Sequence, residues 1–192
     1  MTVTVVRRAD HRVMPWRNGG GTTREIAVRS GSTPGRFAWR LSIATVEQEG
    51  PFSTFEGYDR VIMMLDGGGM TLDVDGVTHR IARPNTPFAF AGEARVHCAL
   101  IDGPIHDFNV MVDRASHWAS VDIIDLGAPL DLAPAVETRA IVILDGRATL
   151  APGPVLDPWD AAIVEPGTAA TLQGTARAAL VTLGLRQGRE QA

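Results

Sequence analysis

The segment MTLDVDGVTHRI, residues 70–81, places Asp75-Gly76 between two runs in which apolar and polar residues alternate. A period of two is typical of half-buried strands, and Asp-Gly favours the tight turn that joins two antiparallel strands. A second segment, RAIVILDGRATL at residues 139–150, has Asp145-Gly146 in the same setting. Both segments therefore predict β-hairpins.

The rest of the chain extends this pattern. In FAWRLSIATV, residues 37–46, one predicted strand face carries large apolar side chains and the other carries small side chains and one arginine. The 20 Gly and 12 Pro residues are spread along the chain as turn formers, and no long window has a period of 3.6 residues. Many short strands with regular turns predict an all-β sandwich or barrel.

Three short motifs recur in the second half of the chain in the same order. They are LDG (65–67 and 144–146), RPNT and EPGT (83–86 and 165–168), and GEAR and GTAR (92–95 and 174–177), at offsets of 79, 82 and 82 residues. This repetition predicts two copies of one β-unit, at about 15–113 and 114–186. We expect a first domain over 1–113 with the ligand pocket. A second domain over 114–192, poorer in charged and aromatic residues, would be mainly structural.

The arrangement of strand, LDG, strand, turn and strand resembles the cupin family, and two copies resemble a bicupin, that is, two jelly-roll barrels in tandem. The resemblance implies a metal held by His and Glu. Phe52, Ser53 and Thr54 stand where the His-x-His pair belongs, Arg60 near the Glu, and Phe90 near the later His. Because a metal site needs three or four convergent ligands, we expect no metal and no cofactor.

Composition narrows the class of function. The chain has 192 residues, 45% of them hydrophobic, and a net charge of −4. A nucleic-acid-binding protein would be basic, so none is expected as a partner. All 18 basic residues are Arg, which excludes Schiff-base chemistry on lysine. Cys98 is the single cysteine, and the sequence has neither a signal-peptide pattern nor an apolar run of membrane-spanning length. These features predict a cytoplasmic protein that does not enter membranes.

The segment MPWRNGGGTTREIAV, residues 14–28, has three consecutive glycines. A phosphate-binding loop would open a helix, but here the glycines precede a β-branched, alternating run. A simple turn explains one or two glycines and leaves the polar neighbours unexplained. We therefore interpret the segment as the rim of a small-molecule pocket, where glycine lets a ligand approach the backbone.

Four segments together resemble the HutD/Ves family of bicupin proteins, which are associated with histidine-utilisation genes. They are PWRNGGGTTREI, FAWRLSIATVEQEGPFSTFEGYDR, FAFAGE and DGPIHDFNVM. Two positions depart from the family pattern: Glu56 stands in place of Pro, and Ile105 in place of a Thr whose hydroxyl would lie beside the pocket. The resemblance implies an accessory protein of histidine catabolism that binds a small pathway metabolite, with no established reaction.

Two arginines are candidate anion-binding residues. On the predicted strand 37–46, Arg40 and Ser42 share a face with small residues, which leaves room beside a fixed cation. The alternative is a solvent-facing surface. Arg60 begins an apolar strand, and its alternative role is a salt bridge with Asp59 or Asp66.

A second group of candidates is polar. Asp107 and Asn109 share one face of a predicted strand and converge there, unless they only stabilise a turn. Glu25 either pairs with an arginine or accepts an N–H from a ligand. Phe90 supplies either an apolar wall or ordinary core. The full candidate set is Trp16, Asn18, Gly20, Thr22, Glu25, Arg40, Ser42, Arg60, Phe90, Asp107 and Asn109.

These residues favour a non-catalytic protein that binds a small acidic metabolite, such as urocanate or N-formylglutamate, in the first cupin unit. The competing hypothesis is a metal-independent isomerase or hydrolase with Glu25 or Asp107 as general base. A third hypothesis is an interaction protein that pairs with itself as a homodimer or with a pathway enzyme.

Overall fold

The computed structural model describes residues 2–186, and the regular elements in this range are strands, joined by turns and loops, and one short 3-10 helix, η1, at Arg8–Asp10. The all-β prediction is therefore confirmed. The strands fall into two compact units. The first unit spans Arg12–His117. The second combines the described residues up to His11 with those from Trp118 onward.

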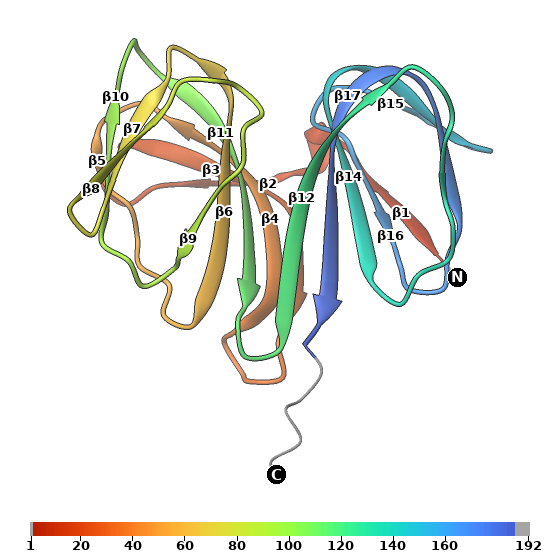
Figure 1. Ribbon diagram of the computed structural model, residues 1–192, viewed down its shortest axis with the longest axis horizontal. Helices are drawn as coiled ribbons and strands as arrows, with labels where there is room; N and C mark the ends of the chain where they lie inside the picture. Colours follow the sequence, from red (N-terminus) through yellow and green to blue (C-terminus); the bar gives the residue numbers. More distant parts are fainter. Residues whose placement is uncertain (1, 187–192) are drawn as a thin grey trace. The chain divides into compact units, whose positions relative to one another are not determined.

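The first unit consists of two sheets. The larger sheet has the order β2 (Arg12–Pro15), β3 (Gly21–Ser30), β4 (Phe37–Val46), β11 (Ile105–Asp113), β6 (Tyr58–Gly67) and β9 (Phe88–Ala91). The smaller sheet has the order β5 (Gly50–Pro51), β10 (Val96–Leu100), β7 (Met70–Val74) and β8 (Val77–Ile81). The two sheets face each other as layers (Figure 1), and apolar side chains such as Ile62, Met64 and Leu72 fill the space between them.

The second unit is built on one seven-stranded sheet. Its main order is β1 (Val3–Val6), β16 (Ala161–Val164), β14 (Thr138–Ala151), β17 (Ala170–Leu185) and β12 (His117–Leu126), with β13 (Leu130–Leu132) on β17 and β15 (Val155–Leu156) on β14. Val3 pairs with Val164 and Val6 with Ala161. This pairing assigns the first strand to the second unit. The division expected from the sequence, at residue 113, placed it in the first.

Of the two predicted hairpins, one is confirmed. Between β7 and β8, Asp75 and Gly76 both have positive φ values, 50° and 87°, as a type I′ turn requires. The second prediction is wrong, because β14 runs uninterrupted from Thr138 to Ala151. There Gly146, with φ of 73°, follows a β-bulge at which the pairing with β17 shifts between Ile143 and Asp145.

The same bulge occurs in both units, and it corrects the predicted repeat. The pairing of β6 with β11 skips Leu65, and the pairing of β14 with β17 skips Leu144, so the LDG motifs at offset 79 are equivalent. The other two matches are wrong. RPNT precedes β9 but EPGT follows β16, although these two strands occupy the same place beside β6 and β14. Likewise GEAR is a loop after β9, whereas GTAR lies inside β17.

The two faces of β4 also need a correction. The large apolar side chains of the face with Leu41 and Ile43 would suggest that this face fills the space between the two sheets. In the first unit that space instead contains Ala44 and Val46, from the opposite face. Leu41 and Ile43 are fully buried as well. Because both faces of β4 exclude water, alternation in side-chain size does not identify the inner one.

Candidate functional site

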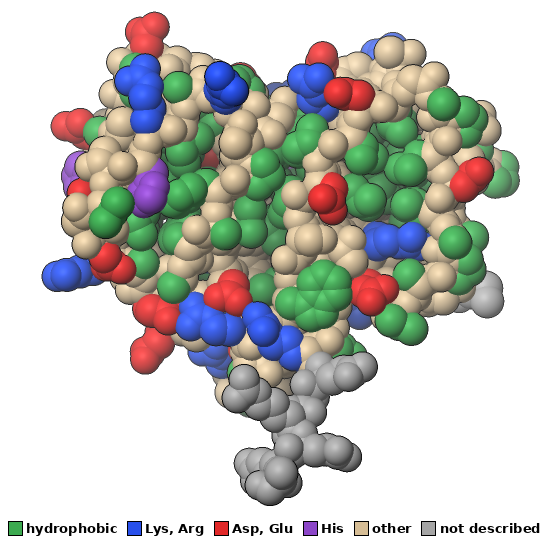
Figure 2. Space-filling model, in the orientation of Figure 1, with side chains coloured by type: hydrophobic (Ala, Val, Ile, Leu, Met, Phe, Trp, Pro, Cys, Tyr) green, Lys and Arg blue, Asp and Glu red, His purple; other side chains and the backbone are tan. Residues whose placement is uncertain are grey.

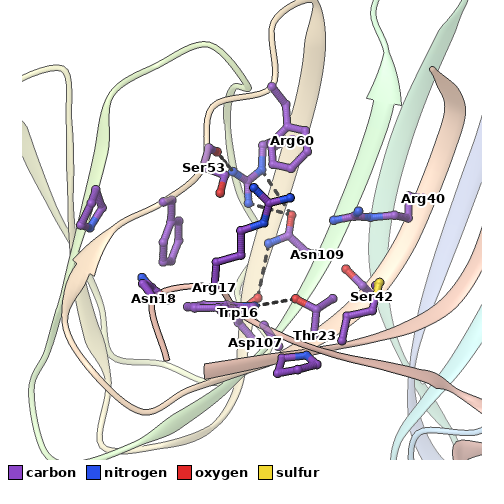
Figure 3. A pocket seen from close by; sticks show the side chains of 16 residues that line it. Trp16, Arg17, Asn18, Thr23, Arg40, Ser42, Ser53, Arg60, Asp107 and Asn109 are labelled. Atoms are coloured by element: carbon purple, nitrogen blue, oxygen red, sulfur yellow. Dashed lines mark hydrogen bonds between the residues drawn. The ribbon is translucent and has the colours of Figure 1, made fainter. Parts of the chain in front are cut away.

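A cavity of about 710 Å³ opens between the two sheets of the first unit. Its walls come from β2, β3, β4, β6 and β11 and from the loops around residues 16–18 and 51–55 (Figure 3). The lining residues are Met14, Pro15, Trp16, Arg17, Asn18, Thr23, Arg40, Ser42, Ala44, Pro51, Phe52, Ser53, Phe55, Arg60, Asp107 and Asn109. This volume is within the range of small-molecule sites.

Strand register explains why distant residues meet here. Met111 on β11 pairs with Arg40 on one side and Arg60 on the other, so the three form one row across the sheet. Two residues further along β11, Asn109 pairs with Ser42. Residues two apart on a strand share a face, so these rows lie on one wall of the cavity.

Arg60 is the most buried of the cavity arginines, with 6% of its surface exposed. Its guanidinium donates to Asn109 Oδ1 at 3.2 and 3.4 Å and to the carbonyl oxygen of Ser53 at 3.3 Å. It also lies 4.8 Å from the centre of the Phe90 ring. Burial lowers the pKa of Arg60 to about 10, Asp107 opposes this, and the nearby charge of Arg40 adds to it. Arg60 thus remains a cation at neutral pH and has neutral hydrogen-bond partners.

Arg40 is half-buried, and its Nε is a buried donor with no hydrogen-bond partner. Its Nη2 lies 3.8 Å from the sulfur of Met111, a weak acceptor. Burial lowers the pKa of Arg40, although Glu25 and Tyr58 oppose the shift. A buried donor without a partner is costly, so the hydrogen bonding of Arg40 is less complete than that of Arg60.

Asp107 and Asn109 form the polar floor of the cavity. Asp107 is 1% exposed and accepts a hydrogen bond from Asn109 Nδ2 at 3.4 Å. Burial raises the pKa of Asp107 to about 6, although the hydrogen bond from Asn109 and the charge of Arg60 oppose the shift. The carboxyl therefore changes charge near neutral pH beside the most buried arginine.

The glycine-rich loop supplies one rim of the cavity. Trp16 donates through Nε1 to Thr23 Oγ1 at 2.8 Å, and Asn18 Oδ1 accepts the N–H of Gly20 at 3.1 Å. Gly19 has a φ of 71°, and a Cβ at Gly21 would lie 2.2 Å from the carbonyl oxygen of Thr45. Turn geometry and close approach to β4 thus explain these two glycines.

Of the candidate residues, seven line the cavity: Trp16, Asn18, Arg40, Ser42, Arg60, Asp107 and Asn109. The other four, Gly20, Thr22, Glu25 and Phe90, are not among its lining residues. Thr23 lines the cavity and Thr22 does not, because Thr23 pairs with Ala44, which faces the cavity. Phe90 pairs with Arg60, and Glu25 pairs with Ser42, so both adjoin the lining. Phe90 contacts the Arg60 guanidinium, and the charge of Glu25 acts on Arg40.

Several lining residues were not among the candidates from the sequence. The sequence could have indicated some of them but not others. Arg17 adjoins Trp16 and Asn18, so the same motif could have indicated it. Phe52 stands where the cupin His-x-His pair belongs, and in the structure it packs edge-on against Trp16. Ser53 contributes a backbone carbonyl, which no sequence pattern marks. Ile105, where a Thr was expected beside the pocket, is instead 1% exposed in the core.

The alternatives for Arg60 are resolved by its neighbours. Asp59 forms an ion pair with Arg114, and Asp66 Oδ1 lies 2.7 Å from His106 Nδ1, within hydrogen-bond distance. On the face drawn in Figure 2, basic and acidic side chains are intermixed. The cavity differs, because three arginines and one carboxyl group line it in a chain of net charge −4. Its surroundings therefore favour an anion.

The cavity residues do not fit the metal that cupins usually hold. Within residues 2–186, no three His, Cys, Asp or Glu side chains gather closely enough to hold a metal ion. Asp107 is the one carboxylate lining the cavity, and its neighbour Arg60 would repel a cation. Separately, none of the helices in this described range has the length and apolarity needed to span a membrane.

Comparisons with known proteins agree with this description. The chain is similar to HutD from Pseudomonas fluorescens over 97% of its length and 100% of that structure, with 34% identity and a TM-score of 0.87. It is 50% identical over 107 residues to a Pseudomonas putida protein from the hutC 3′ region, and 42% identical over 121 residues to protein Ves of Citrobacter koseri. These two matches span 56% and 62% of the relatives' lengths.

More distant structures share the cupin-like fold alone. One is a nickel-bound pirin from Escherichia coli, with 10% identity and a TM-score of 0.67. The family model for HutD matches residues 8–182, nearly the whole chain. The chain therefore belongs to the HutD family, which is linked to the histidine-utilisation region.

Proposed function

We propose that the protein is a non-catalytic binding protein for a small acidic metabolite of histidine catabolism. The observation that carries this proposal is the pair of arginines, Arg40 and Arg60, on one wall of the cavity. Neither of them has an ion pair with a carboxylate in the described part of the chain. A ligand carboxylate would complete the hydrogen bonding of Arg40 and reduce the repulsion between the two cations.

The remaining walls indicate what else the ligand carries. Phe52 and Phe55 contribute apolar rings, and Asn109 and Ser42 contribute uncharged polar groups. A small acid with a planar or polar second group is complementary to such a site. Urocanate and N-formylglutamate have this chemistry and belong to the pathway to which the family is linked. Binding of such a metabolite would let the protein sense the pathway's flux.

A second function is supported by Asp107. A buried carboxyl group with a pKa near 6 is suited to general base catalysis, and it faces the cavity. In a metal-independent isomerase or hydrolase, Asp107 would take a proton while Arg60 stabilised negative charge on the substrate. Glu25 is the weaker candidate base, because it lies outside the cavity lining.

A thermal-shift screen tests the binding function. Histidine-pathway acids should raise the melting temperature of the wild-type protein, because a ligand that binds only the folded state stabilises it. The matching neutral amides should not. Arg40→Gln should reduce the shift, whereas Arg177→Gln should not, because Arg177 is exposed and paired with Asp125 in the second unit. The binding function fails if no acid stabilises the wild type.

Incubation of the same acids with the protein separates the two functions. If the protein only binds these acids, each acid is recovered unchanged after incubation in large molar excess over the protein. Turnover of an acid that stops in Asp107→Asn would establish the catalytic alternative.

A further inference from the structure

Asp107 combines deep burial with incomplete hydrogen bonding. The residue lies on β11 at the floor of the cavity and is almost fully buried. Its Oδ1 accepts the hydrogen bond from Asn109 Nδ2. Its Oδ2 has no hydrogen-bond or ion-pair partner among residues 2–186. Because each oxygen of a carboxylate can accept hydrogen bonds, Asp107 keeps an acceptor for a group inside the cavity.

The orientation of the Asn109 amide is fixed by its two partners. A guanidinium can only donate hydrogen bonds, so Asn109 Oδ1 must face Arg60, and Nδ2 must then face Asp107. Figure 3 shows these hydrogen bonds as a chain from Arg60 through Asn109 to Asp107. A single side-chain amide therefore separates the cation from the carboxyl group. A small ligand that lies along this amide can contact both of them.

Both ends of this chain can still bind a ligand. The guanidinium of Arg60 has more N–H groups than its three hydrogen bonds use. Burial raises the pKa of Asp107 to about 6, against the charges of Arg60 and His106, so the carboxyl group is mostly ionised at pH 7.5. Its Oδ2 then repels a second anion and attracts a hydrogen-bond donor.

The surroundings of Asp107 indicate which donor fits. A ligand that fills the cavity shields Oδ2 from solvent. A buried, ionised oxygen without a donor is costly, so a ligand that lacks a donor at this point should bind weakly. The donor is a neutral group, because Arg60 would repel an ammonium group placed beside Asp107. An amide or heteroaromatic N–H has the required chemistry.

We propose that Asp107 is a specificity-determining residue and that the ligand is a carboxylic acid with a neutral N–H donor. The carboxylate of the ligand binds Arg40 and Arg60, and its N–H donates to Oδ2 of Asp107. This inference rests on the proposed function, because it adds a second contact within the same cavity. It disfavours both simple carboxylates without a donor and amino acids with a free ammonium group.

Titration calorimetry at pH 7.5 with pyrrole-2-carboxylate and furan-2-carboxylate tests this inference. The two probes have the same charge and nearly the same shape, but one has a ring N–H where the other has a ring oxygen. Both are flat, which suits a cavity lined by the rings of Phe52 and Phe55. The wild type should bind the pyrrole about tenfold more tightly, the effect expected of one charge-assisted hydrogen bond.

Asp107→Asn removes the acceptor and keeps the size of the side chain. Because Asn109 Nδ2 can only donate, the oxygen of the new amide must face it, and an NH2 group takes the place of Oδ2. This variant should therefore no longer favour the pyrrole. A role of Asp107 in folding alone would weaken the binding of both probes equally and leave their ratio unchanged.

Glu25→Gln is the matched control, because it removes a carboxylate that lies outside the cavity lining. It should retain the wild-type preference for the pyrrole. Equal binding of the two probes by the wild type, or a preference that survives in Asp107→Asn, would overturn the inference and leave the proposed function intact. Failure of the wild type to bind either probe would contradict the proposed function itself, and the inference with it.

Discussion

The two units contain the same strand arrangement around the LDG bulge, but they place different chemistry on it. With the bulges aligned, Arg60 corresponds to Arg139, because the two arginines pair with Phe90 and Val164 on equivalent strands. Asn109 corresponds to Leu180, the partner of Ile141. Asp107 corresponds to Ala178. One unit therefore has a polar cavity wall where the other has apolar core.

The matching arginines show how this difference arises. Arg60 donates to a side-chain amide and faces the cavity. Arg139 donates to the carbonyl oxygens of Ala133 and Thr168, which belong to loops of its own unit. A cation fixed by backbone groups in this way stabilises loops. The comparison indicates that the polar partners at 107 and 109, rather than the arginine alone, distinguish the polar cavity wall of the first unit from the apolar core of the second.

The largest expected effect tests whether the two bulges are equivalent. Gly67 and Gly146 both have positive φ, 100° and 73°, and an added Cβ would lie 2.6 and 2.3 Å from a backbone carbonyl oxygen. We expect Gly67→Ala and Gly146→Ala each to lower the free energy of unfolding by about 3 kcal/mol or more. Denaturant unfolding measures this. Gly76→Ala, with no atom near the new Cβ, should cost only about 1 kcal/mol.

If one of these two variants loses stability and the other unfolds like the wild type, then β6 and β14 do not share the same bulge geometry.

The next effect concerns position 178. Ala178 is fully buried in the apolar core of the second unit. Ala178→Asp would bring a carboxyl group there without the arginine and amide that surround Asp107, so it should destabilise the protein by about 3 kcal/mol. Thermal and denaturant unfolding provide the measurement, with Ala178→Val as a control for size. A mild effect would mean that the second unit can accommodate a polar wall.

A smaller effect concerns pH. The pKa of Asp107 is raised to about 6 in the folded protein, so the stability that its protonated form contributes is present at low pH. It is lost as the pH rises from about 4 to 6. Asp107→Asn should therefore be more stable than the wild type by about 1–3 kcal/mol at pH 7.5, and the difference should disappear near pH 4.

Unfolding curves at several pH values measure this difference. A stability difference that is constant from pH 4 to 7.5 would contradict a raised pKa.

The sequence was informative where a local rule applied, as at the Asp75-Gly76 turn and for the all-β class. It failed at Asp145-Gly146, because whether Asp-Gly ends a strand depends on how far the partner strand continues. It also identified seven residues that line the cavity. Alternation along a strand indicated four of them, Arg40, Ser42, Asp107 and Asn109, because it predicts which residues share a face. Alternation did not distinguish Thr22 from Thr23, because that requires the register with β4. Nor could it reveal the carbonyl of Ser53, which contributes no side chain.

The measurement that tests the central claim most directly is titration calorimetry of a small carboxylate against Arg60→Gln and Arg139→Gln. Arg60→Gln should weaken binding by about tenfold or more, because a charge-assisted hydrogen bond contributes roughly 1.5–3 kcal/mol. Arg139→Gln should bind as the wild type does, although it unfolds more easily. Equal losses in both folded variants, or wild-type affinity in Arg60→Gln, would contradict the assignment of ligand binding to the first unit.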